Sequence, residues 1–367
     1  MKALIFHPAL APYRVDFFNS LNEYYSASFY FSLKNVSDQK FNQENLKSLC
    51  NFKCNYVSNG FEVLGRSIRT GVFSIIKKEN PDIIFCAEYN QITLLAFLYC
   101  KIKNPRIKIY TLSDDSIKNS EDRKGLRLFF RNFISKNING VVFTSKEVSN
   151  WYKVNVSTKS NTLDFPVIHS EKSLLKKYSN AVNQANINIA KYDLKDKKVL
   201  LYVGRLVDVK NLFFLIKCFS NVKEKDKKLV LVGEGVLKEK LIEFTEKLGI
   251  LKDVLFIGRK EGIELYNWYL FSQLFVLPST SEPFGAVVNE ALVGGCRVLC
   301  SDLAGASSLI NKKNGVLFNP NEENDLSTKL KQAFDEVKPL GKSITELRES
   351  AMPFTFDQKM QDLLKNI

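Results

Sequence analysis

The chain has 367 residues, of which 45% are hydrophobic and 12% aromatic. This length exceeds one ordinary core and suits two domains, and the composition excludes an intrinsically disordered protein. Its 53 lysines and arginines against 39 acidic residues give a net charge of +14, which favours an anionic partner such as nucleic acid, anionic lipid or a phosphorylated substrate, unless the lysines serve solubility alone.

The start of the chain, MKALIFHPAL, lacks the apolar core and cleavage site of an export signal. The longest uncharged apolar run, residues 92–100, is far shorter than the ~20 residues that span a bilayer. The cysteines are odd in number, and their spacing does not fit zinc, so we expect a reducing compartment and no structural metal. The expected location is the cytoplasm, either in solution or peripheral on the inner face of the cell membrane.

Short apolar runs alternate with amphipathic stretches along the whole chain. The predicted strands are residues 2–7, 27–33, 82–87, 107–112 and 140–145 in the first half, and 198–204, 228–233, 253–258, 273–278 and 297–301 in the second. Helical patterns lie between them, for example at 15–25, 67–80 and 235–249. This alternation predicts an α/β protein with two doubly wound, Rossmann-like domains facing across a cleft, with parallel sheets covered on both faces.

The polar, aromatic-poor stretch 176–198 is predicted to contain the connection between the domains. We therefore assign residues 1–175 to the first domain and 196–350 to the second. Ligands of such sheets bind beyond the carboxyl ends of the strands, so the loops there are the places to search for a site.

The loop YVGRLVDVKN (202–211) follows a predicted strand. Gly204 permits a tight turn, and Arg205 and Lys210 supply a planar fork and a mobile point charge, a pair that suits a diphosphate. The alternative is two ordinary surface bases. Cations near a helix start are disfavoured by the helix dipole, which favours the functional interpretation.

The loop VGEGVLKEK (232–240) carries Gly233 and Gly235. They match half of a dinucleotide-binding fingerprint, but Lys238 stands where a third glycine or alanine is required. The pattern is therefore weak evidence for a nicotinamide or flavin, and it equally indicates a loop that lets a ligand approach the backbone closely.

The stretch SEPFGAVVNEA (281–291) connects a predicted strand to a helix expected to begin near Phe284–Ala286. Free amides at that helix start make an anion site, and Gly285 leaves room for the anion. Glu282 lies in the loop, and Glu290 about one and a half turns into the helix. A site that binds an anion between two carboxylates, each able to accept hydrogen bonds from hydroxyls, would fit the diphosphate, sugar and ribose of a nucleotide sugar. The alternative is a loop acid that offsets the dipole and a solvated helix residue.

The second half resembles the retaining glycosyltransferases of family 4, which have the GT-B fold. The motifs that carry the resemblance occur in the family's order: GRLVDVK (204–210), GEG (233–235), the pair Glu282 and Glu290 in SEPFGAVVNEA, SDLAG (301–305) and NGVLFNP (314–320).

The resemblance assigns Arg205 and Lys210 to the donor diphosphate, Glu282 to hydroxyls of the donor sugar and Glu290 to the ribose. It implies that the loop around Gly258–Lys260 borders the base. The remaining residues expected at the donor are Gly204, Gly233, Gly235 and Arg259, with the amides of Phe284, Gly285, Ala286 and Val287 near the phosphates.

The first half carries weaker likenesses. Residues 6–21 and 87–95 resemble segments of bacterial transferases that build O-antigens and capsules, and residues 352–367 resemble the closing helix that crosses back onto the first domain. Asp114 and Asp115 stand where many relatives carry a histidine near the reaction centre. They are expected either to orient the acceptor or the donor sugar, or to cap the helix that follows.

The function implied is the transfer of a hexose or N-acetylhexosamine, with retention, from a nucleotide-diphosphate sugar to a glycan acceptor. Resemblance favours a UDP-sugar donor and a role in lipopolysaccharide or capsule biosynthesis. An acceptor linked to a polyprenyl diphosphate would fit a membrane-bound helix at residues 121–136. The catalytic residues would be Glu282, Arg205, Lys210 and Asp114. Fixed positive charges can stabilise the leaving diphosphate, and the chain lacks a spaced Asp-x-Asp at a strand end, so we expect no metal and no cofactor.

Residues 121–136 carry Arg123, Arg127 and Arg131 interleaved with aromatic residues. Such a helix can lie on anionic lipid with its aromatic face inserted. A buried aromatic face with solvated arginines accounts for the same pattern.

Three other functions are compatible with parts of the sequence. A nucleic-acid binder would use the positive charge, but the basic residues are scattered and no recognition motif appears, so we expect no nucleic-acid partner. A sugar-nucleotide epimerase of the same fold would convert its donor without an acceptor. A non-catalytic protein would bind a nucleotide or polyanion without turnover.

Overall fold

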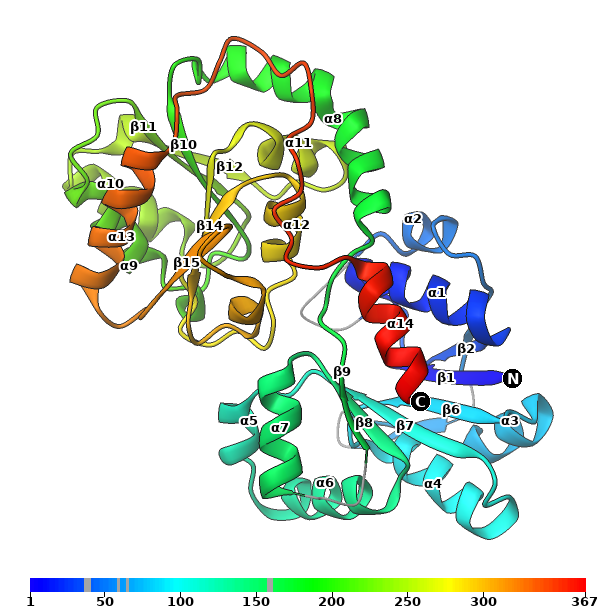
Figure 1. The fold of residues 1–367 in the computed structure, drawn as a ribbon. Coiled ribbons are helices and arrows are strands. Elements are labelled where there is room, and N and C mark those ends of the chain that lie inside the picture. The colour runs from blue at the N-terminus through cyan, green and yellow to red at the C-terminus, as the bar shows by residue number, and fades with distance from the viewer. Residues whose placement is uncertain (36–40, 58–59, 64–65, 157–160) are drawn as a thin grey trace. The chain divides into compact units, whose positions relative to one another are not determined.

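The computed structural model describes residues 1–35, 41–57, 60–63, 66–156 and 161–367. The chain forms two compact units. Met1–Val167 and Asp357–Ile367 make up the first unit, and Ile168–Phe356 the second. Each is an α/β unit built on a twisted parallel sheet (Figure 1).

The first unit contains a seven-stranded parallel sheet in the order β3-β2-β1-β6-β7-β8-β9. The strands are β1 (Ala3–His7), β2 (Ser28–Phe31), β3 (Cys54–Tyr56), β6 (Ile83–Ala87), β7 (Lys108–Ser113), β8 (Gly140–Phe143) and β9 (Asn161–Asp164). The two central strands β1 and β6 are almost wholly buried because helices cover both faces, which explains their continuous apolar sequences. A separate antiparallel pair is formed by β4 (Gly60–Val63) and β5 (Arg66–Arg69).

Helices join these strands. They are η1 (Pro12–Arg14), α1 (Val15–Tyr25), α2 (Gln43–Ser48), α3 (Val72–Glu79), α4 (Gln91–Lys103), α5 (Ile117–Glu121), α6 (Gly125–Asn137), α7 (Lys146–Asn155) and the C-terminal α14 (Phe356–Asn366). The predicted helix 15–25 is confirmed. The helix predicted at 67–80 is wrong in its first part, because residues 66–69 pair as a strand and the helix begins after Gly71.

The C-terminal helix α14 packs beside the last strand of the first unit. Lys359 pairs with Asp164 of β9 at 3.1 Å, and the side-chain amide of Asn161 donates to the carbonyl of Asn366 at 2.8 Å. The terminal residue Ile367 accepts a hydrogen bond from the hydroxyl of Tyr110 on β7.

The second unit contains a six-stranded parallel sheet in the order β12-β11-β10-β13-β14-β15. Its strands are β10 (Lys198–Val203), β11 (Lys227–Val232), β12 (Val254–Gly258), β13 (Leu274–Leu277), β14 (Arg297–Ser301) and β15 (Gly315–Phe318). Its helices are α8 (Glu171–Lys191), η2 (Asp208–Lys210), α9 (Leu212–Asn221), α10 (Lys238–Lys247), η3 (Leu251–Asp253), α11 (Ile263–Phe271), α12 (Val287–Val293), η4 (Gly305–Leu309) and α13 (Glu323–Glu336). The predicted fold class, two parallel-sheet α/β domains, is confirmed.

The prediction that residues 176–198 contain the domain connection is wrong. Most of that stretch is helix α8, which belongs to the second unit, and the units divide after Val167 rather than at residue 175. The buried positions of α8 recur at helical spacing: Leu174, Tyr178, Ala181, Ala185 and Ile189. Between Tyr178 and Ile189 the buried residues are Ala181, Ala185 and Asn188. This part of the stripe is compact enough to pack closely on α11 but too polar in sequence to suggest a core helix.

No helix among the described residues is long and apolar enough to cross a bilayer.

Candidate functional site

The residues singled out in the second half gather at one edge of the second sheet. Strands β12, β11, β10, β13 and β14 are consecutive neighbours and parallel, so the loops that follow them emerge side by side. These loops contain the five candidate segments: 204–210, 233–235, 258–260, 282–290 and 301–305.

The loops after β10 and β11 are in backbone contact. A Cβ added at Gly233 would overlap the carbonyl of Gly204, and one added at Gly235 would overlap the carbonyl of Leu206. The amide of Leu206 donates to the carbonyl of Glu234 at 2.9 Å. Both glycines of the GEG motif therefore have a packing role, in addition to any role toward a ligand.

Lys210 and Glu282, which come from different loops, form an ion pair. Lys210 ends η2, and Glu282 lies in the loop after β13. Their side chains are only 14% and 16% exposed, which limits the screening of the pair by solvent. A backbone bond of 3.0 Å from Thr280 to Val209 holds the two loops together.

Arg205 lies in the same loop as Lys210 and has a fixed backbone and an exposed side chain. The hydroxyl of buried Tyr202 donates to the carbonyl of Arg205 at 2.8 Å. Within the part of the chain that the structure describes, no carboxylate pairs with its guanidinium. The site therefore presents one uncompensated cation and one cation balanced by Glu282.

The loop SEPFG is shaped by its neighbours. Gly285 has φ +98°, and a Cβ there would lie 2.7 Å from the Leu277 side chain, so this glycine is required by conformation and by space. Phe284 is buried and accepts a backbone bond from Ala306, which joins this loop to the SDLAG segment.

Helix α12 begins at Val287, with Ala286 at its N-cap, slightly later than expected. Glu290 therefore lies in the first turn, and the expectation of one and a half turns is wrong. Its amide closes that turn on the carbonyl of Ala286 at 3.2 Å.

Glu290 points inward. Only 8% of the residue is exposed; one carboxylate oxygen accepts from the hydroxyl of Tyr269 at 2.7 Å, and the other lies 3.5 Å from the imidazole of His169. Burial, followed by the charge of Glu290, raises the pKa of Tyr269 well above its usual value, so the tyrosine stays a donor. The alternative in which Glu290 is a solvated helix residue is therefore wrong.

The loop after β12 adjoins the GEG loop. The amide of Gly233 donates to the carbonyl of Gly258, which has φ +80°. Arg259 is exposed and forms an ion pair with Glu261. Arg259 therefore lies next to the other candidate loops, but its charge is balanced by Glu261 in its own loop.

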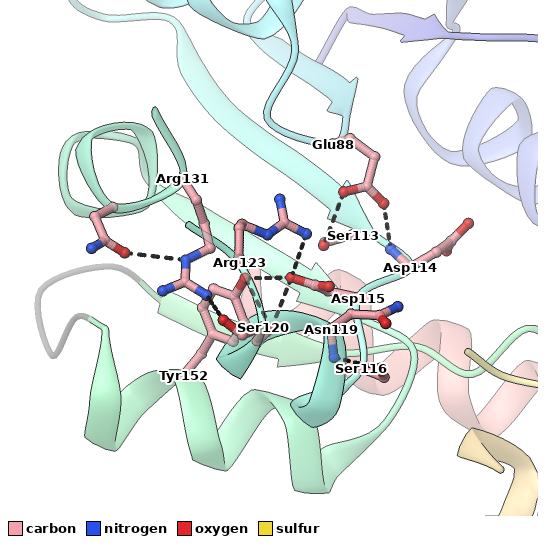
Figure 2. Close-up of polar contacts among 11 residues, drawn as sticks. Glu88, Ser113, Asp114, Asp115, Ser116, Asn119, Ser120, Arg123, Arg131 and Tyr152 are labelled. Atoms are coloured by element: carbon pink, nitrogen blue, oxygen red, sulfur yellow. Dashed lines mark hydrogen bonds and ion pairs between the residues drawn. The ribbon is translucent and has the colours of Figure 1, made fainter. Parts of the chain in front are cut away.

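Asp114 belongs to the first unit, in the loop after β7 (Figure 2). Its carboxylate pairs with buried Arg14, and its amide donates to Glu88 at 2.7 Å. The structure does not assign it a helix-capping role, because Ser116 is the N-cap of α5 and accepts from the amide of Asn119 at 3.1 Å.

Asp115 is a buried anchor, only 3% exposed. Its carboxylate accepts from the hydroxyls of Ser120 and Tyr152, both at 2.8 Å, and pairs with Arg123 at 2.9 Å (Figure 2). Because its acceptor sites are used internally, Asp115 orients Arg123 rather than a substrate.

Glu88 was not singled out from the sequence, although it lies in the noted segment 87–95. It follows β6 with a left-handed backbone, φ +58°, which is unusual for a non-glycine residue and is found at functional sites. Its carboxylate accepts from Asp114 N and from the hydroxyl of Ser113. Burial and the neighbouring charge of Asp114 raise the pKa of Glu88 to about 7.

Glu88 lines two cavities at the carboxyl edge of the first sheet. One, of about 670 Å³, is lined also by Arg123, Lys124 and Arg127. The other, of about 150 Å³, is lined also by His7. The left-handed backbone, the raised pKa and the cavities of Glu88 all depend on the folded structure, so the sequence alone could not single out this residue.

The arginine pattern of residues 121–136 does not form one solvated face. Arg131 is 4% exposed, donates to the carbonyl of Ser120 and lies over the ring of Tyr152, whereas Leu126 and Phe129 are 76% and 61% exposed. The interpretation with buried aromatics and solvated arginines is wrong, because the buried Asp115 network draws arginines inward.

The second unit is similar to a known family of proteins. Residues 184–349 match the family described as "Glycosyl transferases group 1".

Related sequences carry the same kind of name. A Campylobacter jejuni N-acetylgalactosaminyltransferase acting on a diphospho-undecaprenol-linked sugar is 34% identical over 164 residues, which is 43% of this chain and 44% of that protein. An uncharacterized glycosyltransferase of Methanocaldococcus jannaschii is 32% identical over 134 residues, covering 36% of this chain and 34% of the relative. The matches thus span less than half the length of these two relatives.

Solved structures share the whole fold. Anabaena HepE in complex with UDP has a TM-score of 0.73 at 15% identity, over 100% of this chain and 99% of that one. The lipopolysaccharide outer core galactosyltransferase WaaB has a TM-score of 0.66 at 15% identity, over 100% of both chains. The fold is therefore that of GT-B glycosyltransferases.

Replacing Gly233 by Ala should destabilise the second unit. The new Cβ would meet the carbonyl of Gly204, and backbone strain and overlap of this kind cost at least about 2 kcal/mol. Urea unfolding of the full chain measures the loss. Gly341→Ala is the matched control, because a Cβ there has open space. Equal stability of the two variants would contradict the close packing of the loops.

Replacing Glu88 by Gln should change how stability depends on pH. The pKa of Glu88 is about 7 in the folded chain, above its ordinary value of 4.5, so its contribution is fully present below pH 4.5 and is lost as pH rises to about 7. The variant has no ionisable group at this position and does not lose this stability. The difference in melting temperature, variant minus wild type, should therefore increase as the pH is raised from 5 to 8. The exposed Glu121→Gln is the control; a constant difference for Glu88→Gln would refute the raised pKa.

Proposed function

We propose that this chain is a retaining glycosyltransferase that moves a hexose or N-acetylhexosamine from a nucleotide-diphosphate sugar, with UDP the first choice of nucleotide, to a lipid-linked glycan acceptor. The observation that carries the proposal is that the exposed Arg205 and the Lys210–Glu282 pair lie on loops that meet at the carboxyl edge of a parallel sheet. The match to group 1 glycosyltransferases covers this edge.

Arg205 and Lys210 supply the charge that a departing diphosphate needs. Cleavage of the sugar–phosphate bond leaves negative charge on the phosphate, and cations already held in place stabilise it without reorganisation. Tyr202 fixes the backbone of Arg205, and Glu282 holds Lys210 in place before a donor arrives. These two cations serve the role that a divalent metal would otherwise have, so we propose metal-independent transfer.

Glu282 and Glu290 are assigned to hydroxyl groups of the donor. A carboxylate has about four acceptor positions, so Glu282 can keep Lys210 and still accept from a sugar hydroxyl. Glu290 uses one oxygen toward Tyr269, and its other oxygen, 3.5 Å from the imidazole of His169, is proposed to accept from the ribose as well. The backbone amides from Phe284 to Val287 are proposed to contact the phosphates.

Retention follows in this proposal if the acceptor hydroxyl attacks the face from which the diphosphate departs. The leaving phosphate oxygen then takes the acceptor's proton, so this chemistry needs no dedicated base. Asp114, held by Arg14, is proposed to orient the acceptor.

The choice of donor and acceptor comes from the relatives. HepE has been solved with UDP, and the Campylobacter relative is named for a diphospho-undecaprenol-linked acceptor. We therefore propose a role in surface polysaccharide assembly such as lipopolysaccharide or capsule, with the enzyme cytoplasmic and peripheral at the inner membrane face.

Purified protein incubated with UDP-glucose, UDP-galactose and their N-acetylamino counterparts tests the activity. We expect slow release of UDP from one of them, and NMR of the product should show the donor's anomeric configuration. Interconversion of donors without an acceptor would identify an epimerase instead, and binding without turnover of any donor would identify a non-catalytic protein.

Arg205→Ala should weaken UDP binding by about 10- to 100-fold, because a charge-assisted hydrogen bond contributes about 1.5–3 kcal/mol. Isothermal titration calorimetry measures the change. Lys247→Ala, an exposed cation at the end of α10, is the control for the loss of one positive charge. Unchanged affinity in Arg205→Ala would remove this residue from the site.

Glu282→Gln should reduce kcat by about 100-fold or more without weakening UDP binding. The amide keeps the shape of the side chain but releases Lys210, whose charge then becomes fully available to the diphosphate. The two readouts are donor turnover and UDP affinity. A fully active variant would refute the sugar-hydroxyl role.

A further inference from the structure

The larger cavity of the first unit lies at the carboxyl ends of β6 and β7, has a volume of about 670 Å³ and combines positive charge with an aromatic wall. Arg123, Lys124 and Arg127 line it from the segment that enters α6, and Phe130 lies one turn further along the same helix. Glu88, Tyr89 and Asn90 line it on the side of β6, and Asn119 and Asp122 line it from α5 and its C-cap, so three cations face two carboxylates in the lining.

The charges at the start of α6 are arranged against the helix dipole. Lys124 is the N-cap residue and makes no side-chain capping bond, and the first turn contains no acidic residue. Within residues 66–156, no carboxylate pairs with Lys124 or Arg127. Cations at an amino terminus with free amides repel the dipole, and an anion bound there reverses this repulsion.

Arg123 is held in place before any ligand arrives. Its guanidinium pairs with Asp115 at 2.9 Å (Figure 2). The guanidinium also lies 5.9 Å from the centroid of the Tyr89 ring, and the side chain is 21% exposed. Asp115 is in turn fixed by Tyr152 and Ser120. A guanidinium that is already held in position is well suited to donate two parallel hydrogen bonds to phosphate oxygens.

An exposed apolar surface adjoins the cavity. We call Leu126, Phe129 and Phe133 of α6, together with Leu98 and Ile102 of α4, the apolar patch; each residue is between 37% and 76% exposed. The two helices meet where Phe97 contacts Phe133, with ring centroids 5.6 Å apart. At 100° per residue, Phe130 of the cavity wall lies between Leu126 and Arg127 around α6, so the patch continues from the cavity.

We propose that the cavity binds the phosphate or diphosphate group of a lipid-linked acceptor through Arg123, Lys124 and Arg127, and that the apolar patch holds the first part of its hydrocarbon chain. The inference rests on the proposed glycosyltransferase function and assigns the acceptor to a site in the first unit. Charge complementarity selects the phosphate, and the adjoining apolar surface selects an amphiphile over a soluble phosphorylated sugar.

The test is titration of the full chain with geranyl diphosphate, pyrophosphate and geraniol, with saturating UDP present so that the donor edge of the second unit is occupied. Geranyl diphosphate should bind at least about tenfold more tightly than pyrophosphate, because its hydrocarbon is removed from water. Geraniol alone should bind weakly.

Two variants separate the charge from the apolar surface. Arg127→Gln should weaken both geranyl diphosphate and pyrophosphate at least about fivefold, whereas Phe129→Ser should weaken only geranyl diphosphate. Both positions are exposed, so folding is preserved. Lys77→Gln on α3 and Val154→Ser on α7 are the matched controls for charge and apolar surface.

Unchanged affinity in Arg127→Gln would overturn the cavity assignment. Equal binding of pyrophosphate and geranyl diphosphate, with no effect of Phe129→Ser, would overturn the lipid and indicate a soluble phosphorylated acceptor. Association with phosphatidylglycerol vesicles without affinity for geranyl diphosphate would also overturn the assignment and make the patch a bilayer-docking face. Failure of the proposed function would appear separately, as a lack of UDP binding with the geranyl diphosphate response intact.

Discussion

The candidate donor site depends on backbone contact between the loops that follow β10 and β11. Gly233 and Gly235 let the two loops touch, and three backbone bonds join them: Gly204 to Val232, Leu206 to Glu234, and Leu237 to Leu206. A loop held in this way loses little further entropy when its side chains meet a ligand. Arg205 therefore extends from a rigid base, and the same rigidity positions η2, which carries Lys210.

Carboxylates near these edges are stabilised in three different ways. Glu282 is balanced by the charge of Lys210, whereas Glu290 is buried against Tyr269. Glu88 has a backbone amide and a hydroxyl as donors, but its burial, followed by the charges of two nearby aspartates, outweighs them and raises its pKa. A charged group kept in a strained or desolvated position, as Glu88 is, costs folding free energy, and such positions are concentrated at functional sites.

Much of the fold could be predicted from the sequence, because buried parallel strands are continuous apolar runs. All ten predicted strands are present. Among the strands that were missed, β3 (Cys54–Tyr56) and β9 (Asn161–Asp164) are short and polar and lie at the edges of the first sheet, where one side lacks a neighbour. The apolar but short β15 (Gly315–Phe318) was missed at an edge of the second sheet. Helix α8 was missed because Ala181, Ala185 and Asn188, rather than large apolar residues, form the middle of its buried stripe.

Part of the candidate site could likewise be predicted from the sequence, and part could not. Loops after neighbouring parallel strands must converge, so the proximity of Arg205, Lys210 and Glu282 follows from topology and could be predicted. The hydrogen-bond and ion-pair partners of each side chain could not be predicted from the sequence. Only coordinates show that Glu290 turns toward Tyr269, that Asp115 anchors Arg123, or that Glu88 has a left-handed backbone. Each depends on contacts between residues far apart in the sequence.

The most direct test of the central claim is calorimetric titration of the full chain with UDP, GDP, TDP and ADP, first with a chelator and then with Mg²⁺. We expect one nucleotide to bind without metal, with a Kd on the order of micromolar, and Mg²⁺ to change this affinity little. Binding of none of the four, or binding only with Mg²⁺, would contradict the claim that Arg205 and Lys210 form a metal-independent diphosphate site.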